Sequence, residues 1–255
     1  MNTVARNALS KVPEVTLYFW VIKILATTVG ETAADFLNFN LHLGLSNTTL
    51  IMSALLAAVL VAQFRTRRCV GGIYWLAVVL ISIVGTLVTD NLVDNLGVPL
   101  PTTVWAFGGA LTATFIGWYA SEKTLSIHSV TTNRREAFYW LAILFTFALG
   151  TAAGDLAAET MKLGYANSTL MFAAMIGVVT VAYYGFRANA IAAFWAAYIL
   201  TRPLGASFGD LLSQPVSRGG FGWGTVGTSA AFLSAIFVLV VYLSQQRKRS
   251  LGNAV

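Results

Sequence analysis

The chain has 255 residues, of which 57% are hydrophobic and only 10% are charged, and its mean hydropathy is +0.72. Soluble globular chains are about 45–50% apolar and about 25% charged, so this composition excludes a disordered protein, a nucleic-acid-binding module and an ordinary cytosolic enzyme. With one cysteine, Cys69, the chain has neither an internal disulfide nor a thiolate metal cluster. We therefore predict an all-α polytopic membrane protein.

Eight apolar segments are long enough to cross a bilayer, which takes about 20 mostly apolar residues. They are residues 14–41, 48–64, 71–95, 102–120, 137–161, 168–186, 189–213 and 224–245. We expect no removable signal peptide, because the polar N-terminus is short and the first apolar run is long enough to span.

The basic residues are distributed unevenly between the loops. If all eight segments cross the membrane, one side holds most of the 16 Lys and Arg residues, namely Arg6, Lys11, Arg65, Arg67, Arg68, Lys123, Arg134, Arg135, Arg187, Arg247, Lys248 and Arg249. The opposite loops hold only Lys162 and Arg218. By the positive-inside rule both termini are predicted to be cytoplasmic, and the net charge of +6 reflects topology rather than nucleic-acid binding.

One motif recurs four times without a gap: an aromatic residue and Trp, then nine residues, Gly, four residues and Asp. The copies are Phe19-Trp20 with Gly30 and Asp35, Tyr74-Trp75 with Gly85 and Asp90, Tyr139-Trp140 with Gly150 and Asp155, and Phe194-Trp195 with Gly205 and Asp210. Such periodicity indicates tandem structural units. Each unit is predicted to contain two helices, so all four insert in the same orientation and are related by rotation about the membrane normal.

The two halves of the chain also align with each other at an offset of 120 residues, with eight identities over residues 30–50. This alignment predicts two pseudo-symmetric halves in parallel orientation, each with four transmembrane helices and two repeats. The halves are residues 1–121 and 137–255, and a polar cytoplasmic linker of residues 122–136 joins them.

The fourfold pattern resembles a family of bacterial membrane-anchored proteins with four tandem two-helix repeats of unknown function, each carrying a characteristic tryptophan. The corresponding residues here are Trp20, Trp75, Trp140 and Trp195. The resemblance covers essentially the whole chain and implies an eight-span protein of the bacterial inner membrane. It implies no activity, so the function is argued from the residues.

Seven of the ten acidic residues lie on the odd-numbered segments within or just beyond the Gly-to-Asp part of the motif: Glu31, Asp35, Asp90, Asp94, Asp155, Glu159 and Asp210. A carboxylate inside a bilayer costs at least about 2.5 kcal/mol and usually marks a functional pathway. Residues four apart, such as Glu31 and Asp35, share a helix face where like charges repel, so a cation, a basic side chain or a proton must compensate. We expect Lys23 and Arg202, which lie eight residues before Glu31 and Asp210, to neutralise one carboxylate each.

The motif glycines lie among small residues, which allow close helix approach in lipid. We therefore assign helix packing or a hinge to Gly30, Gly85, Gly150 and Gly205. Close packing would bring the motif aspartates around one axis in the outer half of the membrane, and we predict that they bind a metal ion there; they are Asp35, Asp90, Asp155 and Asp210. The alternative is a structural polar network of these aspartates with Lys23, Arg202 and threonine hydroxyls.

The motif tryptophans lie three to seven residues into their segments, at the depth where aromatic side chains form interfacial belts. We expect a belt or packing role for them, and the alternative is an inner gate or a cation–π contact.

The leading functional hypothesis is a secondary transporter of a small hard cation, because all candidate ligands are oxygens, which suit Mn²⁺, Mg²⁺ and Ca²⁺. Mn²⁺ is favoured over Mg²⁺ because methionines such as Met161, Met171 and Met175 are available. The chain has no ATPase motif, so the driving force would be an ion gradient, and the carboxylates could exchange protons for the cation. The expected partners are the lipid bilayer, the cation and protons, and a homo-oligomer is left open.

The second hypothesis is a membrane-embedded binding or sensor protein without transport, holding a small molecule between the halves near Trp105, Trp118 and Trp223. An intramembrane enzyme would need a polarised nucleophile or a metal–His centre. The sequence has neither pattern, so we predict no enzymatic activity.

Overall fold

The computed structural model describes residues 10–40 and 43–252, and within them the chain forms eight α-helices of 19 to 29 residues and no strand. The helices are α2 (Leu17–Asp35), α3 (Leu45–Arg65), α4 (Gly71–Asp90), α5 (Leu100–Glu122), α6 (Asn133–Asp155), α7 (Gly164–Phe186), α8 (Ala190–Ser213) and α9 (Gly224–Gly252). The predicted all-α architecture with eight long helices is confirmed. Arg6 and the side chains of Arg247, Lys248 and Arg249 lie outside the described part.

Three of the motif helices continue as five-residue π-helical segments directly after the motif aspartate. These segments are η1 (Phe36–Asn40), η2 (Asn91–Asn95) and η4 (Leu156–Thr160). Helix α8 has no such extension and ends at Ser213, because Pro215 follows two residues later and the residue before a proline disfavours helical backbone. Short π-helical segments often occur at functional sites, and here they follow the acidic motif residue.

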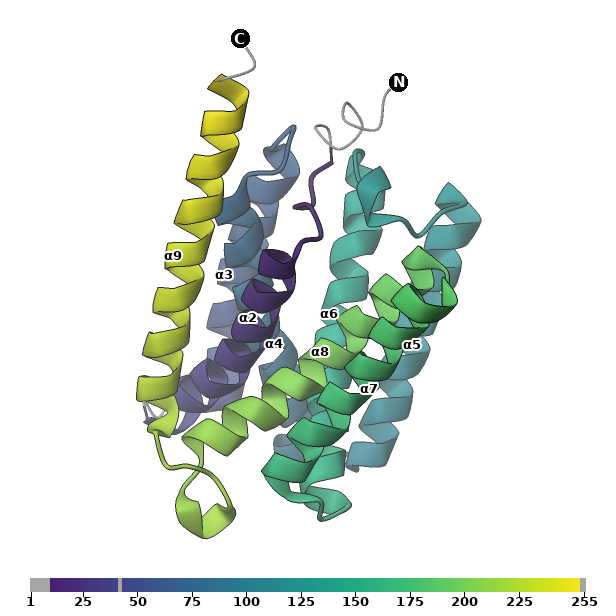
Figure 1. The fold of residues 1–255 in the computed structure, drawn as a ribbon. Helices are drawn as coiled ribbons and strands as arrows, with labels where there is room; N and C mark the ends of the chain where they lie inside the picture. The colour runs from purple at the N-terminus through teal and green to yellow at the C-terminus, as the bar shows by residue number, and fades with distance from the viewer. Residues whose placement is uncertain (1–9, 41–42, 253–255) are drawn as a thin grey trace.

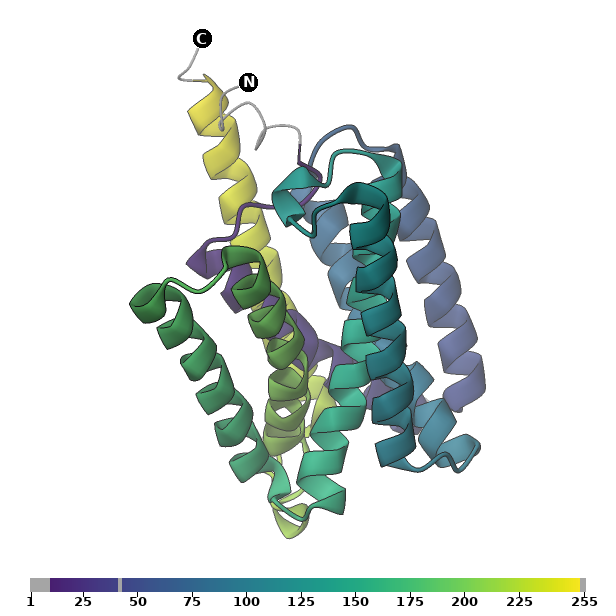
Figure 2. The same cartoon turned by 90° about the vertical axis from the view of Figure 1, so that its right-hand side faces the viewer.

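The four motif helices α2, α4, α6 and α8 form an inner ring in which each one packs against the next and α8 packs against α2 (Figures 1 and 2). Each outer helix packs on the inner helix of the following repeat: α3 lies on α4, α5 on α6, α7 on α8, and α9 on α2. The last repeat therefore closes on the first. This cyclic order is the one expected for repeats related by rotation.

The two predicted halves interlock rather than form separate units. Helix α5 of the first half lies on α6 of the second, and α9 of the second half lies on α2 of the first. The connection between the halves is also shorter than predicted, because helices extend into both ends of residues 122–136. It comprises residues 123–132 and contains a short 3-10 helix, η3 (Ile127–Ser129).

Within the described residues, five helical segments are long and apolar enough to cross a membrane. They are Leu45–Arg65, Gly71–Asn95, Asn133–Thr160, Gly164–Phe186 and Gly224–Gln246. The outer helices expose large apolar side chains such as Leu50, Val178 and Phe237, as contact with lipid requires. Helices α2 and α8 carry charged side chains, and these are buried inside the ring: Lys23 and Arg202 are both fully buried.

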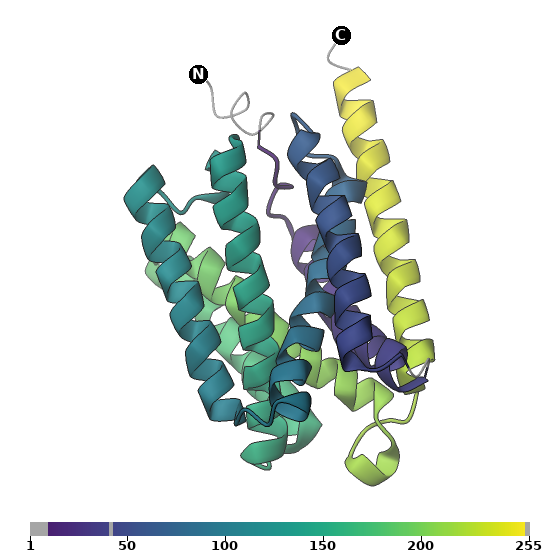
Figure 3. The ribbon, with the colours of Figure 1, turned by 180° about the vertical axis from the view of Figure 1, so that it is seen from behind.

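Both described ends of the chain lie at the same end of the helical ring (Figure 3). We call this the basic end, because the helix ends and connections there carry Arg65, Arg67, Arg68, Arg134, Arg135 and Arg187. The motif aspartates and the π-helical segments lie toward the opposite end, which we call the acidic end.

The motif glycines set the spacing of the inner ring. Each contacts the residue three positions before the motif glycine of the next inner helix. The pairs are Gly30 with Ser82, Gly85 with Phe147, Gly150 with Arg202, and Gly205 with Thr27. A Cβ atom at any of the four glycines would lie 1.9–2.9 Å from the facing side chain, so only glycine permits this approach. This outcome agrees with the predicted helix-packing role.

The aromatic-Trp pairs form a closed collar of rings, residues 19–20, 74–75, 139–140 and 194–195, which we call the aromatic collar. The first aromatic of each repeat contacts the tryptophan of the next, with ring centroids 5.4–6.2 Å apart, in the pairs Phe19–Trp75, Tyr74–Trp140, Tyr139–Trp195 and Phe194–Trp20. Trp75, Trp140 and Trp195 are buried. These three tryptophans pack inside the ring, and a lipid-facing belt is the wrong interpretation for them.

The N-terminal segment packs against the helices at the basic end. The Lys11 backbone N–H donates to the carbonyl of Val130 (3.0 Å), and its ammonium forms an ion pair with Glu136 on α6 (2.6 Å). Gln63 on α3 donates to the same carboxylate (3.0 Å). Lys11, Gln63 and Glu136 are all buried. Lys11 therefore ties the N-terminal segment to α3 and α6. The sequence by itself predicts only that Lys11 contributes positive charge before the first apolar segment.

Replacement of Gly30 by alanine is expected to destabilise the ring, because the new Cβ would lie 1.9 Å from Ser82 Oγ and 3.0 Å from Ser82 backbone carbon. Overpacking of this kind costs about 1–3 kcal/mol. The matched control is Gly177→Ala on α7, where nothing lies within 4 Å, and this change is neutral or stabilising by up to about 1 kcal/mol. Thermal unfolding in detergent measures both, and equal midpoints would contradict the packing role.

Replacement of Lys11 by methionine is expected to lower the free energy of unfolding by about 3–5 kcal/mol, because it leaves the Glu136 carboxylate buried without its partner. The double variant Lys11→Met with Glu136→Gln removes that uncompensated charge and recovers part of the loss. Thermal unfolding of the single and double variants tests the coupling. An additive outcome would mean that the two side chains do not interact.

Candidate functional site

The site lies on the axis of the inner ring, just beyond the motif glycines. The residue that follows the motif glycine is Glu31, Thr86 or Thr151 in the first three repeats, and all three contact Arg202; the fourth repeat has Ala206 at this position. The guanidinium of Arg202 occupies the same layer. Its Nη2 donates to Glu31 Oε2 (3.0 Å) and to Thr151 Oγ1 (2.6 Å). It also donates to Thr86 Oγ1, so one nitrogen links three inner helices to α8.

Arg202 reaches the axis across the neighbouring helix α6 at Gly150, where its Cγ fills the space that a Cβ would take. The side chain is fully buried, and its Nε and Nη1 atoms have no hydrogen-bond partner among the described residues. It forms an ion pair with Glu31, which lies on α2. Arg202 therefore neutralises one carboxylate, and the ring geometry directs its guanidinium across the axis to α2 rather than along its own helix to Asp210.

Lys23 does not compensate a carboxylate, contrary to the sequence-based expectation. Its Nζ donates to Thr201 Oγ1 (2.6 Å) and to the Tyr198 carbonyl (3.1 Å). It also lies 3.8 Å from the ring centroid of Tyr198 and 4.9 Å from that of Phe147. The reason is position: Lys23 lies two helical turns before Glu31, toward the basic end, and faces α8 and α6.

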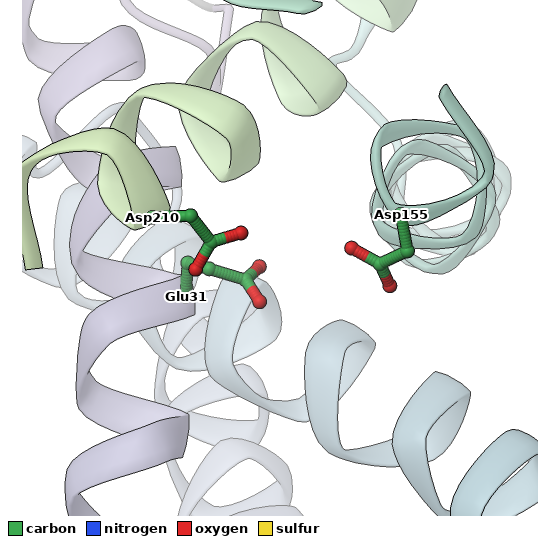
Figure 4. A group of neighbouring side chains, drawn as sticks. All are labelled: Glu31, Asp155 and Asp210. Carbon is green, nitrogen blue, oxygen red and sulfur yellow. The ribbon is translucent and has the colours of Figure 1, made fainter. Parts of the chain in front are cut away.

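Three carboxylates converge on the acidic side of Arg202, and we call Glu31, Asp155 and Asp210 the carboxylate triad. They come from α2, α6 and α8, and one oxygen of each lies within 4.8 Å of the others. Figure 4 shows Glu31 and Asp210 side by side with Asp155 facing them. Oxygens that share a divalent cation at about 2.0–2.6 Å lie no more than about 5 Å apart, so the triad has the spacing of a cation site.

Glu31 and Asp210 are buried and Asp155 is half-buried. Gln214 extends the cluster to a fourth carboxylate, because its amide nitrogen lies 3.4 Å from Asp35 Oδ2 and 3.5 Å from Asp210 Oδ1. The triad with this amide is thus the centre of a larger acidic cluster.

The other predicted ligands lie outside the triad. Asp90 is half-buried at the end of α4, within electrostatic reach of Glu31 and Arg202. Asp94 and Glu159 lie on π-helical segments and are exposed at the acidic end. The expected convergence of four motif aspartates is therefore realised differently: Asp155 and Asp210 meet Glu31, Asp35 joins through Gln214, and Asp90 stays at the edge.

Sequence reasoning missed three polar residues of the site, Thr86, Thr151 and Gln214. The signal that finds them is the register of the repeats. The position after the motif glycine holds Glu31, Thr86 and Thr151, and the position nine after it holds Gln214 in register with Asp94 and Glu159.

The fold and the site define a class: an all-α protein of four two-helix repeats in a ring, with helices able to cross a membrane and a buried carboxylate cluster on the ring axis. The chain belongs to the family described as Repeat of Unknown Function (DUF347), whose model matches residues 18–69, 73–124, 138–189 and 193–249. Each match spans one inner helix and the outer helix after it. No curated protein and no solved structure matches the chain.

Replacement of Arg202 by methionine is expected to cost about 3–5 kcal/mol of unfolding free energy, because it leaves Glu31 buried beside two other carboxylates without its cation. Adding Glu31→Gln to this variant should restore part of the stability. Arg187→Met, which removes an exposed guanidinium at the basic end, serves as the control and should stay close to wild type. If Arg202→Met unfolds at the same temperature as Arg187→Met, the Arg202–Glu31 ion pair does not stabilise the fold as assigned.

Proposed function

We propose that this protein is a membrane transporter of a small hard divalent cation, coupled to protons, with the carboxylate triad as its ion-binding site. The observation that carries the proposal is the spacing of Glu31, Asp155 and Asp210 on three different helices. Carboxylates inside a membrane protein usually lie on an ion pathway, and a site shared by separate helices changes when those helices move.

The charge of the site supports a divalent ion or its equivalent in protons. The three ionised carboxylates and the Arg202 guanidinium sum to a formal charge of −2. One divalent cation balances this charge, and so do two protons. Exchange of the one for the other therefore keeps the buried site neutral, which is the condition that a low-dielectric interior favours.

The ligand set supports hard cations as a class. All three triad side chains offer oxygen, as Mn²⁺, Mg²⁺ and Ca²⁺ prefer, and no His or Cys of the described residues joins them. The argument for Mn²⁺ over Mg²⁺ from the methionines is lost, because Met161 and Met175 are 63% and 43% exposed rather than buried with Glu31 and Asp210. The proposal therefore names the hard divalent cations without a preferred member.

The arrangement of the two ends supports access from one side. The triad lies toward the acidic end, while the aromatic collar and the Lys11–Glu136 ion pair lie between it and the basic end. By the positive-inside rule, and in the inner membrane of a bacterium, the basic end with both termini faces the cytoplasm and the triad is reached from outside. Transport then requires that the collar and the ion pair open.

The alternative is a membrane-embedded binding or sensor protein with a structural polar network and no transport. The observation that favours it is the bonding of Arg202 to three inner helices, which ties the ring together. The tryptophans expected to line its ligand cavity do not support it. Trp105 and Trp223 are 81% and 59% exposed, and Trp118 is buried against Phe138.

Asp155→Asn, Asp210→Asn and Glu31→Gln are expected to abolish both cation-dependent thermal stabilisation and cation flux in proteoliposomes with Mn²⁺, Mg²⁺ or Ca²⁺. A ligand at 100 times its Kd stabilises the folded state by about 2.7 kcal/mol. The variants lose this gain because a neutral amide replaces one of the charged carboxylates that would bind the cation. A pH-sensitive dye inside the vesicles follows the proton movement.

The matched control is Glu122→Gln, which removes a carboxylate at the basic end, far along the chain from the triad. There a hydrogen bond from Arg135 (2.7 Å) lowers the pKa of the Glu122 carboxyl. Cation binding without flux in the wild type would select the sensor alternative. If no cation stabilises the wild type or crosses the vesicle membrane with it, both the ion site and the transport proposal are wrong.

A further inference from the structure

A cavity of about 810 Å³ lies near the basic end, between α2, α7, α8 and the connection before α6. Its wall is mostly aliphatic and aromatic, with Thr16, Ser126, His128 and Thr180 among its polar members. It reaches Thr201, which is otherwise buried near the middle of α8. No residue of the carboxylate triad lines this cavity. The cavity therefore lies apart from the triad and approaches the ring interior from the basic end.

The Thr201 hydroxyl at this cavity accepts a hydrogen bond from Lys23 Nζ (2.6 Å). Lys23 is fully buried, and no carboxylate of the described residues forms an ion pair with it. The titratable or charged groups near it are Tyr198 and Arg202 from α8. The hydroxyls of Tyr74 and Tyr139, from α4 and α6, are bonded to each other (2.5 Å) in the layer of the aromatic collar.

We propose that Lys23 releases a proton when a cation binds to the triad, and that the cavity gives water from the basic end access to it through Thr201. This inference rests on the proposed function and adds, to the carboxylates of the triad, a second group whose proton the bound cation displaces. Lysine suits the task because its compact ammonium responds to burial and releases a proton, which a guanidinium such as that of Arg202 does not.

The proton step involves two transfers and needs no other reactant. The Lys23 ammonium gives a proton to Thr201 Oγ1, and Thr201 gives its own hydroxyl proton to a water molecule in the cavity. The products are a neutral amine, an unchanged threonine and a hydronium ion that leaves toward the basic end. The reverse steps recharge the amine from the basic end once the cation has left, so Lys23 links cation binding to the pH at the basic end without carrying a proton across the membrane.

The position of Lys23 couples it to the triad by electrostatics. Lys23 precedes Glu31 by eight residues on one helix, a rise of about 12 Å. At that distance, with an effective dielectric constant of about 20, repulsion between the ammonium and a cation in the triad amounts to about tenfold in affinity per unit charge. A divalent cation and the Lys23 proton therefore exclude each other by about a hundredfold.

Lys23→Met and Lys23→Arg test the proposal in opposite directions. Lys23→Met should keep Mn²⁺-dependent thermal stabilisation but release fewer protons than the wild type when Mn²⁺ is added, and its Mn²⁺ affinity should change less between pH 6 and pH 8. Lys23→Arg keeps a permanent charge, so it should bind Mn²⁺ about a hundredfold more weakly than Lys23→Met and should show the same reduced proton release. Proton release by either variant equal to that of the wild type would overturn the proposal.

Cysteine labelling tests the cavity without any transport. In a Cys69→Ser background, Ala197→Cys places a thiol on the cavity wall, and Val178→Cys places one on the outer face of α7, where the side chain is 69% exposed. A charged, membrane-impermeant thiol reagent should label Ala197→Cys only from the basic end and should not label Val178→Cys, which faces lipid. Equal protection of both thiols would overturn the water route.

The two proposals fail in different ways. If the wild type neither binds nor moves Mn²⁺, the proposed function is wrong. If the wild type releases protons on binding Mn²⁺ and Lys23→Met releases as many, only the role of Lys23 is wrong. Should Lys23→Met not fold, Lys23→Arg and the labelling pattern decide the outcome.

Discussion

The close approach of successive inner helices at the motif glycines is the constraint on which the rest of the structure depends. Because Gly150 has no side chain, the stem of Arg202 crosses α6 and reaches the ring axis. The same contact at Gly205 brings α8 against Thr27 and closes the ring between the last repeat and the first. Larger residues at these points would separate the helices, and the side chains of the axis would no longer meet.

Duplication made the four repeats alike, but the charged site depends on where they differ. The layer after the motif glycines holds one acid, Glu31, and two hydroxyls, and a single cation from the fourth repeat serves all three. A symmetric ring would place four like charges together at low dielectric, which is unfavourable. Arg202 therefore stabilises the axis and at the same time leaves Asp155 and Asp210 without a basic partner of their own among the described ion pairs.

The two ends of the ring differ in a way that gives the proposals their direction. Aromatic rings and the buried Lys11–Glu136 pair lie toward the basic end, whereas the carboxylate triad lies toward the acidic end. Lys23 lies between these regions, with only uncharged acceptors and aromatic faces bound to it. One membrane interior thus holds an acid cluster and an isolated ammonium, separated along the axis by the layer of Arg202.

The sequence by itself determined the eight helices, the fourfold repeat and the role of the motif glycines, because these follow from local hydropathy and from a period within the chain. It also identified the charged residues that the interior contains, since their rarity in an apolar chain marks them. Only the tertiary structure decided their partners. Arg202 pairs with Glu31, 171 positions away in the chain, rather than with Asp210, and Lys23 meets Thr201 rather than an acid. Which faces meet depends on how each helix is rotated about its axis and on which repeat it packs against, and neither is encoded in spacing along a single helix.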